Sequence, residues 1–253
     1  LIQNFPSCIV EQDFYYGDTV ELYDQICRGE DEFPLFMQAI AFHGGPVLDL
    51  CCGSGRLTIP VAKLGVDVTG VDLSRDMLAQ LEENINVKNK RLKHRIHLYC
   101  QDMTALSLPH PYGVIMIGAT SIRLLSGSFQ NFFDSLYDYV QEGGCLCFDM
   151  EDLPKMQTNT VQIGEMVTVG LPDALGHLSI ILFQRAIHYS EGVAYVNMAK
   201  ILPGSSQKVL LTSTKYRIFG LDEIKAAAEA SKFGNIAVTG YNADREYFCK
   251  LVK

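Results

Sequence analysis

No run of apolar residues in the 253-residue sequence is long enough for a membrane-spanning helix. The longest segment without Asp, Glu, Lys or Arg covers residues 103–122, and it contains Pro109, Pro111 and Gly113, which a bilayer-spanning helix hardly combines. A basic excess is also missing, because 21 Lys and Arg stand against 29 Asp and Glu, for a net charge of −8. We therefore expect no membrane partner and no general affinity for nucleic-acid phosphates.

Paired cysteine motifs are missing too. The eight cysteines include the neighbours Cys51 and Cys52 and a Cys145-x-Cys147 pair, but no Cys-x-x-Cys, so we expect neither a metal site nor a disulfide framework. Buried thiols in a reducing compartment are the simplest interpretation, and no signal sequence follows Leu1. We predict a cytoplasmic globular protein, which could be a monomer or a homodimer.

From residue 46 onward, short β-rich runs alternate with segments of helical period. Because the runs are almost continuously apolar, they predict a parallel sheet covered by helices on both faces. A helix is expected after Ser74, a plausible N-cap, and another over 129–140, ending before Gly143-Gly144. The expected strands are 46–50, 66–71, 96–100, 114–117 and 145–149.

After residue 151 the rhythm changes, because β-rich runs follow one another without a helix between them. They predict antiparallel pairing, and a helix over 222–231 and a last hairpin then end the chain. We expect an N-terminal helical cover over 1–45, an α/β domain over 46–153 and 220–253, and an inserted antiparallel sheet over 154–219 that acts as a substrate lid or oligomer contact. The four inserted runs are 162–169, 178–189, 193–202 and 208–219.

The stretch from Val47 to Leu57 is the most informative part of the sequence. A buried strand leads directly into Gly53-Ser54-Gly55 and then into a helix. Such glycines permit a sharp turn and let a ligand approach the free N–H groups of the helix N-terminus. Asp72 ends the next strand, where a carboxylate takes both hydroxyls of a ribose. Together these features predict a nucleotide-type site.

The kind of nucleotide follows from what the turn lacks. A dinucleotide fingerprint needs a third glycine where this chain has Thr58, so NAD is disfavoured. No Gly-Lys-Ser/Thr follows, so a P-loop is excluded. Asp49 lies within the first strand, where it would repel a diphosphate and attract an ammonium group. The site therefore suits a nucleoside with a cationic tail.

Three segments, residues 48–57, 71–78 and 101–103, resemble class I S-adenosylmethionine-dependent methyltransferases over about 46–149 and 221–252. The resemblance implies a Rossmann-like, seven-stranded, mostly parallel sheet with helices on both faces and an antiparallel C-terminal hairpin. Its cofactor is S-adenosylmethionine, its product S-adenosylhomocysteine, and no metal is implied. The N-terminal helices and inserted sheet resemble small-molecule members such as amino-sugar N,N-dimethyltransferases and methyltransferases of peptide natural products.

The resemblance also assigns cofactor contacts by position. It implies methionine contacts from the glycine turn, a ribose contact from Asp72, and an adenine amino contact from Asp102. Gly118 opens the loop that meets the sulfonium and the acceptor. In related enzymes a Tyr and an Arg of the N-terminal cover often hold the cofactor carboxylate, and Tyr23 and Arg28 are candidates here. The further implied residues are Asp49, Gly53, Ser54 and Gly55 for methionine, and Leu73, Met77 and Met103 for adenine.

Three residues are candidates for work on the acceptor. Arg123 could pair with an acidic group or be a solvated charge, Glu151 follows the fifth strand at the ligand-binding edge, and His177 in the inserted sheet could move a proton or be structural. We expect in-line methyl transfer to an N or O atom of a small molecule or short natural-product peptide. The alternatives are a non-catalytic S-adenosylmethionine-binding or S-adenosylhomocysteine-binding protein of the same fold and, less favoured, an NAD-dependent oxidoreductase. No Asn/Asp-Pro-Pro-aromatic motif follows the fourth strand, so we expect no nucleic-acid acceptor.

Overall fold

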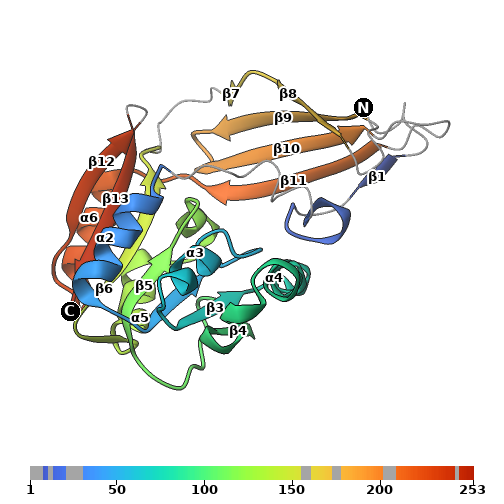
Figure 1. The fold of residues 1–253 in the computed structure, drawn as a ribbon. Helices are drawn as coiled ribbons and strands as arrows, with labels where there is room; N and C mark the ends of the chain where they lie inside the picture. The colour runs from blue at the N-terminus through green and yellow to red at the C-terminus, as the bar shows by residue number, and fades with distance from the viewer. Residues whose placement is uncertain are drawn as a thin grey trace. The chain divides into compact units, whose positions relative to one another are not determined.

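The computed structural model describes residues 8–10, 14–20, 31–154, 161–172, 178–201, 209–242 and 245–253. The chain forms two compact units (Figure 1). One comprises Leu1–Thr19 and Pro154–Ile218, and the other comprises Val20–Leu153 and Phe219–Lys253. No helix within the described part of the chain is long and apolar enough to cross a membrane.

The larger unit contains a seven-stranded sheet in the order β12-β13-β6-β5-β2-β3-β4. The central strands are parallel, whereas β13 runs antiparallel to both β6 and β12. This confirms the predicted Rossmann-like sheet with its antiparallel C-terminal hairpin. The strands are β2 (Val47–Leu50), β3 (Val68–Asp72), β4 (Ile96–Cys100), β5 (Tyr112–Ile117), β6 (Val140–Glu151), β12 (Ala237–Asn242) and β13 (Glu246–Val252).

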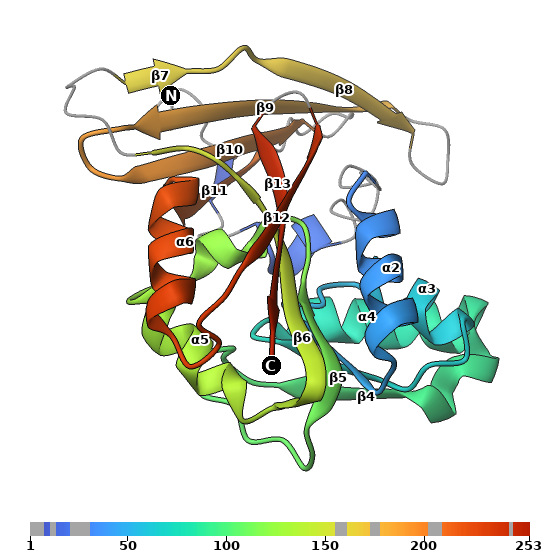
Figure 2. The ribbon, with the colours of Figure 1, turned by 90° about the vertical axis from the view of Figure 1, so that its left-hand side faces the viewer.

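Helices cover both faces of this sheet and create two cores. Figure 2 shows α5 (Phe129–Tyr137) and α6 (Leu221–Ala230) on one face, and α2 (Phe33–His43), α3 (Thr58–Lys63) and α4 (Arg75–Lys88) on the other. Each face buries its own apolar cluster against the sheet, as expected for parallel strands. Two 3-10 helices, η3 (Lys90–Arg95) and η4 (Ser121–Leu124), complete the unit.

The start of α4 follows from local chemistry. The Ser74 hydroxyl accepts a hydrogen bond from the Met77 backbone N–H at 3.1 Å, which satisfies one of the free donors of the first turn. The apolar stripe predicted for this helix, Met77, Leu78, Leu81 and Ile85, is buried. The cap and the stripe are both confirmed, and they fix α4 beside the end of β3.

Several boundaries of helices and strands differ from the sequence prediction. The helix expected to reach residue 140 ends at Tyr137, and Gly143 and Gly144 lie within β6, where the pairing with β5 shifts register. Gly143 has φ 75°, so its positive φ accommodates this irregularity rather than a helix cap. The run expected at 162–169 forms two strands, because pairing with β9 is interrupted between Ile163 and Val167. Pro60 is the third residue of α3, where the helix needs no N–H.

The smaller unit contains a six-stranded sheet built around the antiparallel strands β9, β10 and β11. β7 and β8 both pair with β9, while β1 pairs in parallel with β11. The 3-10 helix η2 (Gly17–Thr19) follows β1. The strands are β1 (Cys8–Val10), β7 (Val161–Ile163), β8 (Val167–Pro172), β9 (Leu178–His188), β10 (Val193–Ile201) and β11 (Val209–Arg217).

The first 45 residues, expected as one helical cover, are divided between the two units. Residues 8–10 form a strand of the smaller unit because their backbone pairs with β11. Helix α2 belongs to the larger unit, where Phe36 packs edge-on against Phe248 of β13 with the ring centroids 5.0 Å apart. Helix α2 thus packs against the seven-stranded sheet of the larger unit.

Candidate active site

Most of the described site candidates lie along one edge of the seven-stranded sheet, at the carboxyl ends of its parallel strands. Ligands of open α/β sheets bind at this edge. The strand order β6-β5-β2-β3-β4 sets the sequence of side chains along it. Reading along the edge, these are Glu151 on β6, Gly118 after β5, the glycine turn after β2, Asp72 at the end of β3 and Asp102 after β4.

The turn after β2 is built from backbone conformations that favour glycine. Gly53 has φ 53° and Gly55 has φ 97°. A Cβ atom on Gly55 would lie 2.2 Å from Leu81 Cδ1 of helix α4, so this position has no room for a side chain. Cys51 adopts φ 58° without being glycine, at a cost of about 1–2 kcal/mol. Ser54, the middle residue of the turn, is buried.

Asp72 connects the glycine turn to the beginning of α4. Its Oδ2 accepts a hydrogen bond from the Gly53 backbone N–H at 2.8 Å, and its Oδ1 accepts one from the Ser74 N–H at 2.8 Å. Burial raises the pKa of this carboxyl, while these backbone hydrogen bonds oppose the rise. Each oxygen keeps a second lone pair. The carboxylate can therefore order the turn and still accept from two hydroxyl groups.

The residues assigned to adenine surround the ends of β3 and β4. Asp102 is exposed, and its Oδ1 accepts from the Thr104 backbone N–H at 2.8 Å and from the Thr104 hydroxyl at 2.7 Å. Leu73 is 61% exposed, whereas Met77 is 1% exposed. Met103 lies against the turn, with its sulfur 3.6 Å from Cys51 Sγ. Leu73 and Asp102 thus present surface at this end of the edge, and Met77 belongs to the core beneath it.

Asp49 and Thr58 form a buried polar pair under the turn. The Thr58 hydroxyl donates to Asp49 Oδ2 at 2.6 Å, and both side chains are shielded from solvent. Burial raises the pKa of Asp49 to about 7, although the Thr58 hydrogen bond and the Arg56 charge oppose the rise. In the sequence, Thr58 was noted only because it stands where a dinucleotide fingerprint has glycine. In the structure it is the hydrogen-bond partner of Asp49, the carboxylate assigned to methionine.

The loop after β5 passes through two consecutive left-handed residues. Ala119 has φ 55° and Thr120 has φ 53°, a conformation that residues other than glycine rarely adopt. A Cβ on Gly118 would lie 2.3 Å from Leu57 Cδ1. The Thr120 backbone N–H donates to Asp149 Oδ2 at 2.8 Å. Asp149, a residue that the sequence placed only at the end of a strand, therefore holds the loop assigned to the methyl-transfer position.

Two predicted acceptor residues meet in the structure. Arg123 Nη2 and Glu151 Oε2 form an ion pair, and their side chains are 11% and 16% exposed. Each charge is therefore largely compensated by the other. A second ion pair joins Arg56 to Glu32, the residue preceding α2, with side chains 18% and 8% exposed. No sequence pattern indicated this second ion pair, because Arg56 and Glu32 are far apart in the chain.

Three other candidates lie outside the described residues: Tyr23 and Arg28, expected to hold the cofactor carboxylate, and His177, expected to act on the acceptor. Their assignments stay predictions. No group of three His, Cys, Asp or Glu side chains within the described ranges is arranged to hold a metal ion.

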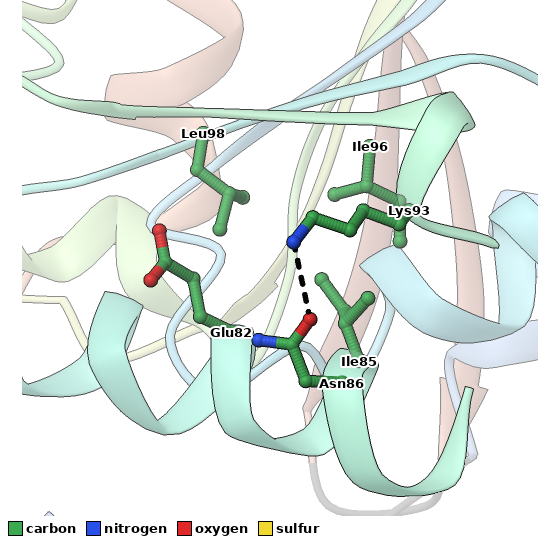
Figure 3. Close-up of a pocket in the computed structure, with 6 residues that line it drawn as sticks. All are labelled: Glu82, Ile85, Asn86, Lys93, Ile96 and Leu98. Carbon is green, nitrogen blue, oxygen red and sulfur yellow. Dashed lines mark hydrogen bonds between the residues drawn. The ribbon is translucent and has the colours of Figure 1, made fainter. Parts of the chain in front are cut away.

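Two cavities of the larger unit lie away from the carboxyl edge. One has a volume of about 240 Å³ and lies between α4, η3 and β4, where Lys93 Nζ donates to Asn86 Oδ1 at 3.4 Å and the apolar side chains of Ile85, Ile96 and Leu98 line the cavity around this hydrogen bond (Figure 3). The other, about 480 Å³, lies beside the segments that lead into β2 and β3. Neither lining contains a residue assigned to the cofactor.

Comparison with known proteins agrees with this geometry. Residues 47–144 match the methyltransferase domain family. The matched segment contains the glycine turn, Asp72, Asp102 and Gly118. A relative from Geobacillus sp. (strain WCH70) that is named as a methyltransferase is 33% identical over 112 residues, which are 44% of this chain and 44% of the relative. Other relatives include 23S rRNA methyltransferases of Shewanella species. The chain spans about half the length, or less, of the curated relatives that it matches.

Solved structures share the fold over nearly the whole chain. The CcbJ methyltransferase of Streptomyces caelestis has a TM-score of 0.72 at 19% identity, covering 95% of this chain and 98% of its own. CalS10, an amino pentose methyltransferase from Micromonospora echinaspora, has a TM-score of 0.68 at 14% identity, covering 96% and 100%. The chain therefore shares the fold of these methyltransferases, and its residues 47–144 are the part that matches a methyltransferase domain.

Proposed function

We propose that this protein is an S-adenosylmethionine-dependent methyltransferase that methylates an N or O atom of a small molecule or a short natural-product peptide. The observation that carries the proposal is the Asp72 carboxylate, which is hydrogen-bonded to Gly53 and Ser74 at the carboxyl edge of the sheet. This carboxylate, the proposed ribose-binding group, is thereby linked to the glycine turn. Both lie in the part of the chain that matches a methyltransferase domain.

The residues present fit this cofactor. Gly53 and Gly55 carry no side chains, so a ligand can approach the backbone of the turn closely. Asp49 offers a carboxylate to an ammonium group, and Asp72 and Asp102 offer oxygens to hydroxyl and amino groups. Structural neighbours were solved with S-adenosylmethionine and with S-adenosylhomocysteine, which supports the same choice.

When bound, the cofactor supplies an electrophilic methyl group on a sulfonium. The protein's own task is then to hold the reacting groups in line and to exclude water. Asp72 and the glycine turn fix the nucleoside, and Asp49 neutralises the ammonium end of the cationic tail. Gly118 and the loop held by Asp149 shape the position beside β5. No residue has to form a covalent bond with the acceptor.

The acceptor class is argued from charge and from the neighbours. The net charge of −8 disfavours a polyanionic acceptor, and one neighbour is named as an amino pentose methyltransferase. The Shewanella relatives named for 23S rRNA provide the rival acceptor, and one of them matches 40% of this chain. A filter-binding assay with ribosomal RNA at low salt separates the two, because retention of RNA would favour the rival.

The cofactor assignment is tested by calorimetric titration of the protein with S-adenosylmethionine, S-adenosylhomocysteine and NADH. We expect micromolar binding of the two sulfur nucleosides and no heat with NADH. Binding of NADH without binding of either sulfur nucleoside would overturn the cofactor assignment that begins with the turn at Gly53. Binding of S-adenosylmethionine without methyl transfer to any tested acceptor would favour a non-catalytic binding protein of the same fold.

A further inference from the structure

One oxygen of a buried carboxyl group in the larger unit has no partner. Asp149 on β6 is 2% exposed. Its Oδ2 accepts from the Thr120 N–H at 2.8 Å, but Oδ1 is buried and has no hydrogen-bond partner within the described part of the chain. Leaving such an oxygen unpaired is costly, and native proteins retain one chiefly where it has a function. It is the one buried carboxylate oxygen in this condition among the described residues.

The place of Asp149 along the sheet edge relates it to the transferred methyl group. The nucleoside-binding residues Asp72 and Asp102 belong to β3 and β4, and the glycine turn follows β2. Gly118 follows β5, the next strand, and Asp149 lies on β6, one strand further from the nucleoside. A ligand that lies along this edge with its nucleoside at β3 and β4 therefore has its reactive end towards Asp149.

The positive charge near Asp149 is limited. Burial raises its pKa to about 7, and the negative charge of Glu32 adds to the rise. Arg56 opposes the rise, but its guanidinium is also the ion-pair partner of Glu32. Burial raises the pKa of the Tyr241 hydroxyl on β12, and the charge of nearby Asp149 adds to the rise.

The remaining titratable neighbours are thiols. Asp149 contributes to raising the pKa values of Cys147 on its own strand and Cys249 on β13, and burial is the larger cause for both. The thiols therefore stay neutral near pH 7. The cation that lowers the pKa of Asp149, Arg56, is shared with Glu32, so a cation from a ligand would balance the charge of Asp149.

We propose that Asp149 receives the protonated amino group of the methyl acceptor, and that the acceptor is accordingly an amine. This rests on the proposed methyltransferase function. The ammonium proton passes to Asp149 Oδ1, and the freed nitrogen lone pair forms the N–CH₃ bond while the C–S bond breaks and its electron pair stays on sulfur. Glu151 is less suited to this task, because Arg123 already neutralises its charge.

Sinefungin tests the assignment without a known acceptor. It is an analogue of the cofactor in which a carbon replaces the sulfur and a protonated amine replaces the transferred methyl group, whereas S-adenosylhomocysteine has neither the methyl group nor a charge there. Calorimetric titration at pH 8 should show that the protein binds sinefungin about tenfold more tightly, or more, than S-adenosylhomocysteine, because a charged hydrogen bond is gained. Asp149→Asn should reduce this preference to less than about threefold and leave the affinity for S-adenosylhomocysteine unchanged.

A matched variant and a pH series complete the test. Asp152→Asn removes a carboxylate of the same segment whose Oδ1 accepts from the Leu221 N–H at 2.8 Å, and it should keep the preference for sinefungin. In the unaltered protein the preference should rise from pH 6 to pH 8, as Asp149 ionises while an aliphatic amine stays protonated. This series needs no variant, so it decides the matter even if Asp149→Asn does not fold.

The outcomes separate the two proposals. If the unaltered protein binds S-adenosylhomocysteine but shows no preference for sinefungin at either pH, the role of Asp149 is wrong and the cofactor assignment stands. An undiminished preference in Asp149→Asn would also overturn that role. If neither compound binds the unaltered protein, the proposed function fails, and the inference that rests on it fails as well.

Discussion

The Gly53 backbone N–H donates a 2.8 Å hydrogen bond to Oδ2 of Asp72. Gly53 lies in the turn after β2, and Asp72 is the last residue of the neighbouring strand β3. The carboxylate therefore holds the turn to which a nucleotide would bind, in addition to offering oxygens to the nucleotide itself. A single side chain couples the shape of the turn to recognition of the ligand.

Replacing Asp72 should consequently remove both effects. We expect Asp72→Ala to weaken S-adenosylhomocysteine binding by about 1.5–3 kcal/mol or more, because charged hydrogen bonds are lost. Calorimetry measures this, and circular dichroism checks that the fold persists. Asp67→Ala is the control, since Asp67 precedes the same strand and forms an exposed ion pair with Arg95 at 2.9 Å. A change in affinity smaller than threefold in Asp72→Ala would contradict the ribose assignment.

The turn also makes a prediction about stability. Gly55→Ala should lower the free energy of unfolding by about 2–4 kcal/mol, because it combines a disfavoured φ with overlap against the buried Leu81. Gly65 has a similar φ of 86° with nothing within 4 Å of a Cβ position. Gly65→Ala should therefore cost only about 1–2 kcal/mol. Equal losses in urea unfolding would show that the site has room for a side chain.

Asp149 should make stability depend on pH. Burial raises its pKa from 3.8 to about 7 in the folded protein, so the folded state holds an extra proton between these two pH values. The free energy of unfolding then falls as pH rises through this window. Asp149→Asn removes the titration. Relative to the unaltered protein it should gain roughly 2–4 kcal/mol between pH 5 and pH 8.

Urea midpoints measured at unit pH intervals give this difference directly. Other carboxyl groups contribute equally to both proteins, so the comparison isolates Asp149. A difference that stays constant from pH 5 to pH 8 would mean that this carboxyl titrates at an ordinary pKa in the folded state.

The Arg123–Glu151 ion pair should show coupling. Because both side chains are largely shielded from solvent, Arg123→Ala and Glu151→Gln should each destabilise the protein by about 1–3 kcal/mol. The double variant should lose less than the sum, by about 1 kcal/mol or more. The affinity for S-adenosylhomocysteine should stay within threefold. Additive losses in unfolding experiments would indicate that the two charges do not interact in solution, and a selective loss of cofactor affinity would move Arg123 to the cofactor side.

Local patterns accounted for the elements that carry their own signals. The Ser74 cap, the buried stripe of α4, and strands such as Ile96–Cys100 followed from residues adjacent in sequence. The glycine turn could also be predicted, because its positive φ values of 53° and 97° favour glycine. Asp72 was found by its position after a strand. These features depend on short-range chemistry, which a single sequence contains.

The rest depends on long-range contacts that no local pattern encodes. Thr58 could not be assigned to Asp49 until both were seen to be buried together. The free oxygen of Asp149 and the Glu32–Arg56 pair arise from elements brought together only by folding. The end of α5 at Tyr137 was missed because Val140, which fits a helical stripe, is instead the first residue of β6.

The pairing of β1 with β11 has a consequence for biosynthesis. The Phe14 N–H donates to the Thr214 hydroxyl at 3.1 Å across 200 residues of sequence. At translation rates of about 5–20 residues per second, the early segment would wait roughly 10–40 s for its partner. Residues 47–144, which match a methyltransferase domain, emerge within that interval. The smaller unit is therefore completed late on the ribosome, and its first strand needs protection from other unpaired strands while it waits.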